Sequence, residues 1–580
     1  MNITQKIRGI GLCICLLMAL SISGWSQNSN DARPVTSTYL IKNAFVVQKP
    51  GTVLPKTSIL IEDGMIKSVG ANVTIPFDAE IIDADSMYVY AAFIDACSHA
   101  GIPKPEAKDR PSVKNPGNPP KGLAGITPQH TVRDAMKEKV DKSMGDLRAL
   151  GFGYVHVVPR GRMMPGQGSV VSTSGGSTDN TILLENVSQF SQFKSARGMF
   201  PATTIGVMSQ FRDLLINAKH SNTYDAQYRM NPKGLDRPVN SNELKALYPV
   251  VDRKMPVFFY TPKIKDVNRA LILQKELGYN MVFTGVRQGW PLMSSITSSR
   301  NPVVLSLKLP EELKEDKPDE DEKDKEEGKG DDKGDDKEKK EKKKEDDKDV
   351  DPELKMLKDK KMKSYKEYVG QAAMFEKKGV AFSFSSLDTK SKDIRSNLIR
   401  MVEHGLSQDA ALAALTTNPA ALLGMSNMAG TVEQGKIANL FITDKPYFEE
   451  ESKIKFIIND GSVKENKEKK KKKSTGDGTV GELAGDWSYA VEIPGQAQSG
   501  VIRISGANDD LSIEVNSSDD PSDFAPASNV SLSDNELTFD LTIEGMTYNL
   551  AMEIDDESFE GTVAVGEFGT FPMSGEKKPN

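Results

Sequence analysis

The feature that most constrains the fold is a long alternation of strand-like and helix-like segments, which starts at Phe93 and ends near residue 426. The strand-like segments are short apolar runs, of the kind that is buried on both faces of a parallel sheet. This repetition predicts parallel βα units, and a (β/α) barrel is their simplest arrangement. The clearest strands are 154–159, 256–260, 302–306 and 380–384, and the clearest helices are 129–150, 264–277 and 363–377.

Segments with a β pattern flank this region on both sides. Residues 35–92 contain several alternating runs and a tight-turn signal at Glu62-Asp63-Gly64. Residues 427–463 return to the same pattern after the last helix. The sequence therefore predicts β-rich structure before and after the α/β region.

Two highly charged segments have a different composition. Residues 311–349 are nearly all Lys, Glu and Asp and lack an apolar period, so we expect a disordered insertion in the barrel region. Lysines interleaved with its acidic residues argue against calcium binding there. Residues 464–480 form a Lys-rich linker, typical of a solvated tether, with binding to an anionic surface as the alternative.

Residues 481–576 form a separate domain of short alternating strands. Turn signals recur about every ten residues, which predicts a closed antiparallel barrel or a sandwich. The segment contains no histidine or cysteine, so metal chemistry is not expected in it. Its expected role is to bind a partner, a glycan or a lipid, or to stabilise its neighbour.

Residues 1–26 have the pattern of a secretory signal. Lys6 and Arg8 precede an apolar run, and small residues before Gln27 place the cleavage there. We therefore expect an exported protein, periplasmic or extracellular. No later stretch is apolar enough to span a bilayer, so the mature chain is expected to have no transmembrane segment.

Length and charge narrow the classes of function. A chain of 580 residues is too long for one core and predicts three or four domains. A net charge of −7 gives no sign of a nucleic-acid partner. Of the three cysteines, Cys13 and Cys15 lie in the N-terminal apolar run. Cys97 is then alone in the mature chain, and no disulfide within one chain is expected.

Cys97 and His99 end the apolar run that begins at Phe93. Residues two apart on a strand point to the same side, so this pair could hold a metal ion at a strand end. The alternative is a small buried thiol beside a hydrogen-bonded histidine. These residues alone leave both interpretations open.

The chain contains several short motifs: Phe93-Ile94-Asp95-x-x-x-His99, Val157-Val158-Pro159 with Gly166-Gln167-Gly168, Ala410–Gly424, Gly430–Leu440 and Ile458–Gly461. Together they resemble the amidohydrolase superfamily, near its imidazolonepropionase-like branch. The motifs from Ala410 onward are the most specific part of this resemblance. A subgroup of the superfamily also shares the Val-Val-Pro segment with a downstream Gly-Gln-Gly.

The resemblance covers about residues 38–463 apart from the charged insertion. It implies an α/β fold, a (β/α)8 TIM-like barrel over residues 93–426. It also implies a small β-sandwich formed by residues 35–92 and 427–463, to which the C-terminal all-β domain is added. Members hydrolyse carbon–nitrogen bonds other than peptide bonds with water activated by a divalent, zinc-like metal.

Other residues stand at several of the metal-ligand positions that the resemblance implies. The first strand normally ends in His-x-His, and this chain has Cys97 and His99 there. The fifth strand normally ends in a histidine, and this chain has Tyr260. Near the sixth strand, Arg287 follows Thr-Gly-Val without a histidine. Tyr260 and Arg287 are therefore expected to line a substrate pocket.

The last strand of the family normally ends in a catalytic aspartate. Leu387 stands at that place here, and Asp388 comes one residue later. A slip of one residue turns a side chain to the other face unless a bulge re-aims it. Asp388 is the candidate catalytic residue, and the candidate metal ligands are Cys97, His99 and, on the second strand, His156, which is otherwise a core histidine.

A catalytic zinc needs about three protein ligands and an open position for water. This chain offers fewer standard ligands, so we expect a degraded metal site with a zinc-like divalent metal or none. The expected function is that of a catalytically impaired amidohydrolase-type hydrolase. The alternative is a non-catalytic binding or assembly partner, a pseudoenzyme of the cell envelope, associated with an envelope protein or an intact relative. The sequence does not identify a small-molecule substrate.

Overall fold

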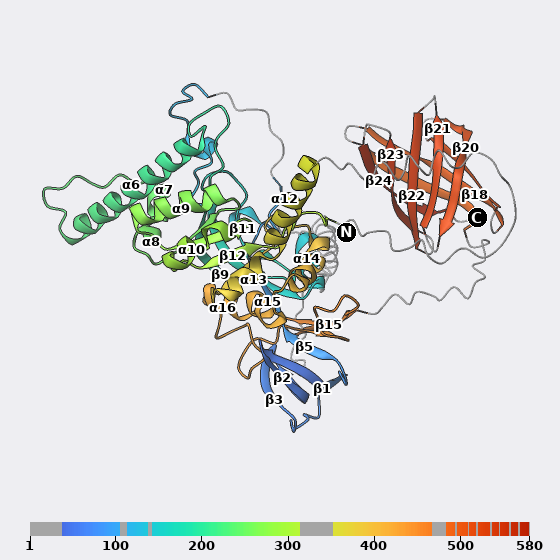
Figure 1. Ribbon diagram of the computed structural model, residues 1–580, viewed down its shortest axis with the longest axis horizontal. Helices are drawn as coiled ribbons and strands as arrows, with labels where there is room; N and C mark the ends of the chain where they lie inside the picture. Colours follow the sequence, from blue (N-terminus) through green and yellow to red (C-terminus); the bar gives the residue numbers. More distant parts are fainter. Residues whose placement is uncertain are drawn as a thin grey trace, which may run out of the picture. The chain divides into compact units, whose positions relative to one another are not determined.

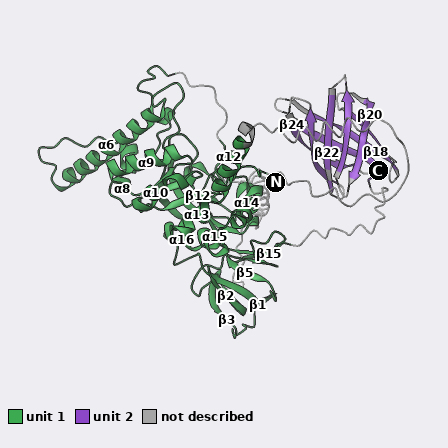
Figure 2. Cartoon of the chain, viewed as in Figure 1, with its two compact units in different colours: residues 1–466 green, residues 467–580 purple. Residues whose placement is uncertain are grey.

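A computed structural model describes the protein over residues 38–104, 113–136, 142–313, 352–466, 483–493, 496–507, 510–517, 520–533, 536–543, 546–555, 558–565 and 569–578. The predicted signal segment 1–26 and nearly all of the insertion 311–349 lie outside these residues, as does most of the linker 464–480. The chain divides into two compact units, residues 1–466 and 467–580 (Figure 2).

Two segments far apart in the sequence form one sheet in the first unit (Figure 1). Its strands are β1 (Thr38–Lys49), β2 (Thr52–Glu62), β3 (Met65–Gly70), β4 (Glu80–Asp83), β5 (Tyr88–Ala91), β14 (Leu440–Thr443), β15 (Ile454–Asn459) and β16 (Ser462–Glu465). The order is β16-β15-β14-β5-β1-β2-β3, with β4 beside β1. β14 joins the two segments, since it pairs with β5 and places Leu440 opposite Ala91. The regions predicted as two parts of a sandwich thus share one eight-stranded sheet.

The sequence explains this sheet locally. Asp63 and Gly64 both have positive φ angles, 52° and 72°, which suit a two-residue hairpin turn between β2 and β3. Alternate residues of the strands are apolar and form one buried cluster. Its most buried members include Ile41, Val46, Ile59, Ile61, Val89, Leu440 and Ile442.

A second eight-stranded sheet forms the centre of this unit. Its strands are β6 (Phe93–Ser98), β7 (Phe152–Val157), β8 (Gly166–Ser172), β9 (Ile182–Gln192), β10 (Val257–Tyr260), β11 (Met281–Val286), β12 (Val303–Ser306) and β13 (Phe382–Ser385). The order follows the sequence from β6 to β13. All pairings are parallel except those of β8, which is antiparallel to both β7 and β9.

The reversal at β8 departs from the predicted repeat of parallel βα units. β7 connects to β8, and β8 to β9, without the crossover that a parallel pair requires. Gly166 and Gly168, the two glycines of the Gly-Gln-Gly motif, lie in β8. Gly168 is needed there, because a Cβ atom on it would lie 2.4 Å from His156 Nε2 and 2.6 Å from Ser188 Oγ.

Hydrogen bonds from side chains link the two end strands of this sheet. Ser385 Oγ donates to the carbonyl oxygen of Cys97 at 2.6 Å. The backbone N–H of Ser386 donates to Asp95 Oδ1 at 3.1 Å. β13 and β6 therefore lie side by side, although they are the first and last strands in the sheet order.

Helices pack around the central sheet (Figure 1). The longer ones are α4 (Lys142–Ala149), α6 (Thr204–Met230), α9 (Ile264–Leu277), α10 (Met293–Ser299), α12 (Pro352–Val369), α13 (Gln371–Lys377), α14 (Ser391–Glu403), α15 (Gln408–Leu415) and α16 (Thr417–Leu422). The predicted helix 363–377 is in fact two helices, because Gly370 separates α12 from α13. No helix among the described residues has both the length and the apolar character needed to cross a membrane.

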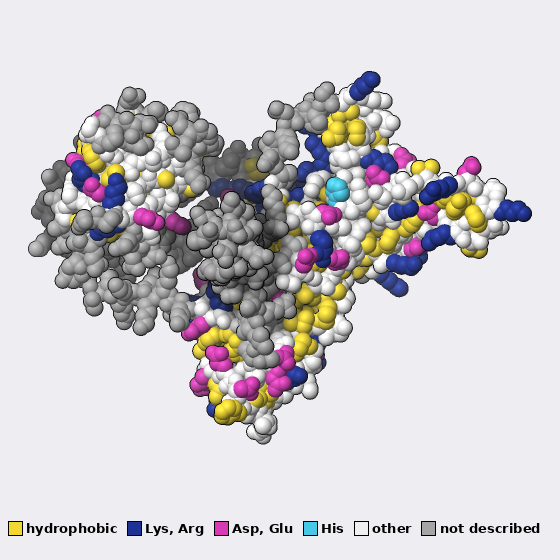
Figure 3. Space-filling view, turned by 180° about the vertical axis from the view of Figure 1, so that it is seen from behind, with side chains coloured by type: hydrophobic (Ala, Val, Ile, Leu, Met, Phe, Trp, Pro, Cys, Tyr) yellow, Lys and Arg dark blue, Asp and Glu magenta, His cyan; other side chains and the backbone are white. Residues whose placement is uncertain are grey.

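The outer part of α6 projects from the rest of the unit (Figure 1). Figure 3 shows hydrophobic side chains next to lysines and arginines on this projection. The large apolar residues exposed on α6 and the segment that follows it are Ile205, Ile216, Met230, Leu235 and Val239.

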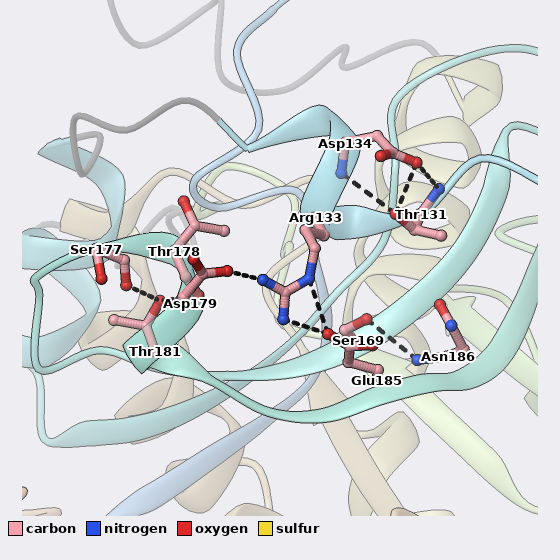
Figure 4. Close-up of polar contacts among 10 residues, drawn as sticks. All are labelled: Thr131, Arg133, Asp134, Ser169, Ser177, Thr178, Asp179, Thr181, Glu185 and Asn186. Carbon is pink, nitrogen blue, oxygen red and sulfur yellow. Dashed lines mark hydrogen bonds and ion pairs between the residues drawn. The ribbon is translucent and has the colours of Figure 1, made fainter.

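Ion pairs of Arg133 connect three elements on the surface near β8 (Figure 4). It lies on the short helix α3 (Val132–Ala135) and pairs with Asp179 of α5 (Thr178–Thr181) and Glu185 of β9. The Nε–Oε1 distance to Glu185 is 2.8 Å. All three side chains are substantially exposed to solvent, so we assign this cluster a modest role in stability.

The second unit is a closed antiparallel barrel, which confirms the predicted all-β domain. Its strands are β17 (Gly485–Ile493), β18 (Gln496–Ala507), β19 (Asp510–Ser517), β20 (Asp520–Ser533), β21 (Glu536–Ile543), β22 (Met546–Asp555), β23 (Ser558–Val565) and β24 (Gly569–Lys577). Trp487, Phe539 and Phe559 fill its interior together with aliphatic residues. Each strand pairs with its neighbour in sequence, and β24 pairs with β17.

Candidate functional site

Four polar residues lie at or just beyond the carboxyl ends of strands in the central sheet. His99 follows β6, Tyr260 ends β10, Arg287 follows β11 and Asp388 comes three residues after β13. We call this group the strand-end site. Ligands in α/β proteins commonly bind at the carboxyl ends of parallel strands.

The carboxylate of Asp388 is the centre of the strand-end site. The Tyr260 hydroxyl donates a hydrogen bond to Asp388 Oδ2. Arg287 Nη2 donates to Tyr260 Oη at 3.2 Å and lies 3.7 Å from Asp388 Oδ2. The structure thus brings together three residues that the sequence analysis singled out on separate strands.

Burial shifts the pKa of two tyrosines at this site. The pKa of the Tyr260 hydroxyl is raised, first by burial and then by the neighbouring Asp388 carboxylate. Burial also raises the pKa of Tyr368, on α12, to about 12, although Arg287 opposes that rise. Both hydroxyls are therefore neutral hydrogen-bonding groups at physiological pH.

His99 is held in one tautomer. Its Nδ1 lies 2.8 Å from the carbonyl oxygen of Val158, and a carbonyl can only accept, so Nδ1 carries the proton. Burial lowers the pKa of His99 to about 4, with further lowering from Arg160 and Lys194. Nε2 of this neutral ring is consequently left with a lone pair that can accept a proton or bind a ligand.

Cys97 lies in the core beside this site. Its side chain is fully buried in an apolar cluster with Ile94, Phe190 and Phe258. Burial raises the pKa of its thiol well above the ordinary value, and the carboxylates of Asp95 and Asp388 raise it further. A protonated, enclosed thiol is a weak nucleophile and a poor metal ligand.

His156 is a fully buried residue of β7. Its Nδ1 lies 2.8 Å from the carbonyl oxygen of Ala96, and its Nε2 lies 2.8 Å from Ser188 Oγ. Burial lowers its pKa to about 4, so the ring is neutral. Both ring nitrogens are used inside the protein, which leaves neither free to bind a metal.

Asp95 is a buried carboxyl group that the sequence analysis quoted only as part of a motif. Its Oδ1 accepts from the backbone N–H groups of Cys97 and Ser386, each at 3.1 Å, and its Oδ2 accepts from the Ser386 hydroxyl. Burial nevertheless raises its pKa to about 7. A charged residue inside an apolar strand is the sequence signal that could have revealed it.

The donor set does not fit a catalytic zinc. In the described part of the chain, no three His, Cys, Asp or Glu side chains lie close enough together to hold a metal ion. His99 Nε2 and Asp388 are the suitable donors, and Asp388 already pairs with the cation of Arg287. Cys97 and His156 are enclosed, as described above, and a neutral phenol such as Tyr260 is a poor ligand.

A narrow hollow opens beside Arg287. Tyr368, Gln371 and Ser306 line it together with apolar residues. Sequence reasoning missed Tyr368 and Gln371, because they lie on helices after the charged insertion with no motif around them. Their helical spacing alone resembles that of ordinary packing residues.

The comparisons with known proteins agree with this geometry at the level of the fold. Residues 357–465 match the amidohydrolase family. This match contains Asp388 and β14–β16, and it does not extend to Cys97 or His99. A 63-residue segment is 36% identical to 5-methylthioadenosine/S-adenosylhomocysteine deaminase of Pyrococcus furiosus. It makes up 11% of this chain and spans only 15% of that relative's length.

Solved structures are similar to a larger share of the chain. A crystal structure of an amidohydrolase from Thermotoga maritima covers 73% of this chain and 99% of its own, with 20% sequence identity and a TM-score of 0.56. A prolidase complexed with N-methylphosphonate-L-proline covers 74% of this chain and 100% of its own, at 13% identity and a TM-score of 0.40. The first of these similarities shows an amidohydrolase-like α/β fold.

Proposed function

We propose that the chain is an amidohydrolase-family protein that binds a small polar molecule at the strand-end site without metal-dependent hydrolysis. The central sheet then acts as a TIM-like barrel, with this site at its mouth. One observation carries the proposal: the carboxylate of Asp388, the candidate catalytic residue one position after the place of the family's aspartate, is engaged by Tyr260 and Arg287. An amidohydrolase-like fold and the family match over residues 357–465 support the family assignment.

The ligand we propose carries a negative charge. Three positively charged side chains influence the site electrostatically, those of Arg160, Lys194 and Arg287. The carboxylate of Asp388 is the negative charge among them. Arg160 also donates to the carbonyl oxygens of Ile102 and His99, which places its guanidinium beside His99. An excess of positive charge in a partly buried site favours a carboxylate or phosphate group.

The test of binding uses the full chain and defined anions. Glutarate is expected to raise the melting temperature in a concentration-dependent way, whereas its diamide, which has the same shape without charge, is expected to leave it unchanged. Arg287→Met should abolish the glutarate effect, and Arg212→Met, at a surface ion pair with Glu276, should preserve it. Equal responses to glutarate and glutaramide would count against an anionic ligand.

Hydrolysis of carbon–nitrogen bonds other than peptide bonds is the second candidate function. The tautomer of His99 favours it, because a histidine that donates Nδ1–H to a backbone carbonyl presents Nε2 as metal ligands do. It requires about one tightly bound zinc, manganese or iron per chain. Metal analysis of the native protein, before and after incubation with each metal, separates the two functions. Stoichiometric metal would overturn the first proposal.

We further propose that the protein acts outside the cytoplasm, in the periplasm or extracellularly, with an envelope protein or an intact amidohydrolase relative as partner. The signal-like pattern of residues 1–26 supports the location. Fractionation of the native host tests the location, and affinity purification from the envelope fraction tests the partner. A full-length chain that stays in the cytoplasm with residues 1–26 attached would exclude both.

A further inference from the structure

We infer that the guanidinium of Arg287 has replaced a divalent metal as the counter-charge of Asp388, and that Gln371 and Gly285 hold this replacement in position. The inference rests on the proposed function, since it explains why the donor set does not fit a metal. It assigns roles to two residues, Gln371 and Gly285, that do not touch Asp388.

The charge at the centre of the site is already neutralised within the protein. Arg287 and Asp388 are partly buried, with 24% and 33% of their side chains exposed, and the nearest N–O distance is 3.7 Å. The planar guanidinium group of arginine is well suited to pairing with a carboxylate. A divalent cation at Asp388 would have to approach a fixed positive charge, and the two would repel each other.

Gln371 fixes the turn that carries Arg287. Its Oε1 accepts from the backbone N–H of Gly289 at 2.6 Å, and its Nε2 donates to the carbonyl oxygen of Val286 at 3.3 Å. The two bonded backbone groups lie before and after Arg287 in the sequence. Gln371 is buried, with 5% exposure, so water does not compete with them.

Gly285 makes room for the tyrosine that completes the arrangement. It has a φ angle of +66°, and a Cβ atom on it would lie 2.7 Å from Tyr260 Cε2. Because any other residue would push the ring away, Tyr260 reaches Asp388 only with glycine at this place. The Tyr260 hydroxyl then donates a hydrogen bond to Oδ2 of Asp388, an oxygen that a metal would need as a ligand.

The experiment compares zinc binding by full-length variants, measured by calorimetry and by metal analysis after gel filtration. Tyr260→His supplies a third donor next to His99 Nε2 and Asp388, which is the number that a catalytic zinc requires. We expect this single variant to bind zinc weakly, and the double variant Tyr260→His/Arg287→Met to bind it at least about 10-fold more tightly. Tyr260→His/Arg287→Lys keeps the charge and should resemble the single variant.

Matched substitutions complete the design. Tyr260→His/Arg212→Met removes an exposed arginine that pairs with Glu276 and should behave as Tyr260→His. Tyr260→His/Gln371→Leu frees the turn around Arg287 and should bind zinc between the single variant and the Arg287→Met double variant. If Arg287→Met does not tighten zinc binding in a folded Tyr260→His protein, Arg287 is not the counter-charge.

The wild-type chain gives an independent readout that needs no variant to fold. Zinc chloride at a concentration near 1 mM should leave its melting temperature unchanged, because a ligand raises it only by binding the folded state. A clear rise in that temperature would overturn both this inference and the proposed function. If wild type binds no metal and Tyr260→His/Arg287→Met binds zinc no more tightly than Tyr260→His, this inference is wrong and the proposed function still stands.

Discussion

Asp95 on β6 accepts hydrogen bonds from Ser386, the residue that follows β13, through both the backbone N–H, at 3.1 Å, and the hydroxyl of that serine. The two strands are the ends of the central sheet. The same carboxyl group also accepts from the backbone N–H of Cys97. One buried side chain therefore connects the first and last strands next to the strand-end site.

Asp95→Ala should destabilise the first unit strongly. It leaves two buried backbone N–H groups and the Ser386 hydroxyl without this acceptor, and we expect a loss of about 3 kcal/mol in the free energy of unfolding. Urea unfolding followed by circular dichroism measures it. Asp213→Ala, at an exposed position of α6, is the control and should change stability by less than about 0.5 kcal/mol.

The raised pKa of Asp95, about 7 in the folded state against 3.8 for a free side chain, predicts a pH dependence of stability. Between these two values the folded chain holds a proton that the unfolded chain has released. This contribution is complete below pH 4 and is lost as the pH rises towards 7. We expect it to change the free energy of unfolding by about 2–4 kcal/mol.

Asp95→Asn isolates this effect, because the amide has the shape of the neutral acid and does not titrate. The unfolding free energy of wild type minus that of Asp95→Asn should fall between about pH 4 and pH 7 and then stay level. His99 and His156 have lowered pKa values, so their contribution has the opposite sign and is lost as the pH falls from 6.5 to 4. It cancels in the difference, since both chains contain them. A pH-independent difference would contradict the raised pKa of Asp95.

His156→Leu should destabilise the protein without affecting any bound metal. It leaves the Ala96 carbonyl and the Ser188 hydroxyl unpaired in a fully buried place, at a cost of about 3 kcal/mol. His220→Leu, on the exposed surface of α6, is the control. A His156→Leu protein of normal stability that has lost stoichiometric metal would show that His156 is a ligand instead.

Two glycine substitutions should act in opposite directions. Gly168→Ala would force a methyl group against His156 and Ser188, and we expect a loss of about 2–3 kcal/mol in the free energy of unfolding. Gly145→Ala lies in α4, where a Cβ atom meets nothing within 4 Å. It should stabilise the chain by about 0.5–1 kcal/mol. Equal effects of the two substitutions on the melting temperature would contradict the close packing at Gly168.

Part of this structure is predictable from the sequence, because local pattern determines it. Phe93–Ser98 is an apolar run and forms β6, and Tyr260 ends a strand that the run Pro256–Tyr260 predicts. The alternating strands after residue 481 likewise predict an all-β domain, and the structure is a closed barrel. Such runs also predict the strand ends at which the site residues lie, namely His99, Tyr260, Arg287 and Asp388.

The rest depends on contacts between distant residues. His156 has the same local pattern whether it binds a metal or fills the core. Its surroundings are determined by Ala96, Ser188 and Gly168 on other strands. The antiparallel direction of β8 could not be predicted for a similar reason, because the residue pattern of a short buried strand does not indicate its direction. Likewise, no sequence pattern relates Gln371 to the turn around Arg287, because they meet only through the packing of α13.

The pairing of β5 with β14 determines when the first unit can fold during synthesis. β1 to β5 leave the ribosome early, yet β5 receives its neighbour only when Leu440 and the residues after it have been made. During that interval β5 presents an unpaired edge, which is the part of a sheet that most readily joins foreign strands. A shortened nascent chain that ends before β14 is therefore expected to need protection by a chaperone.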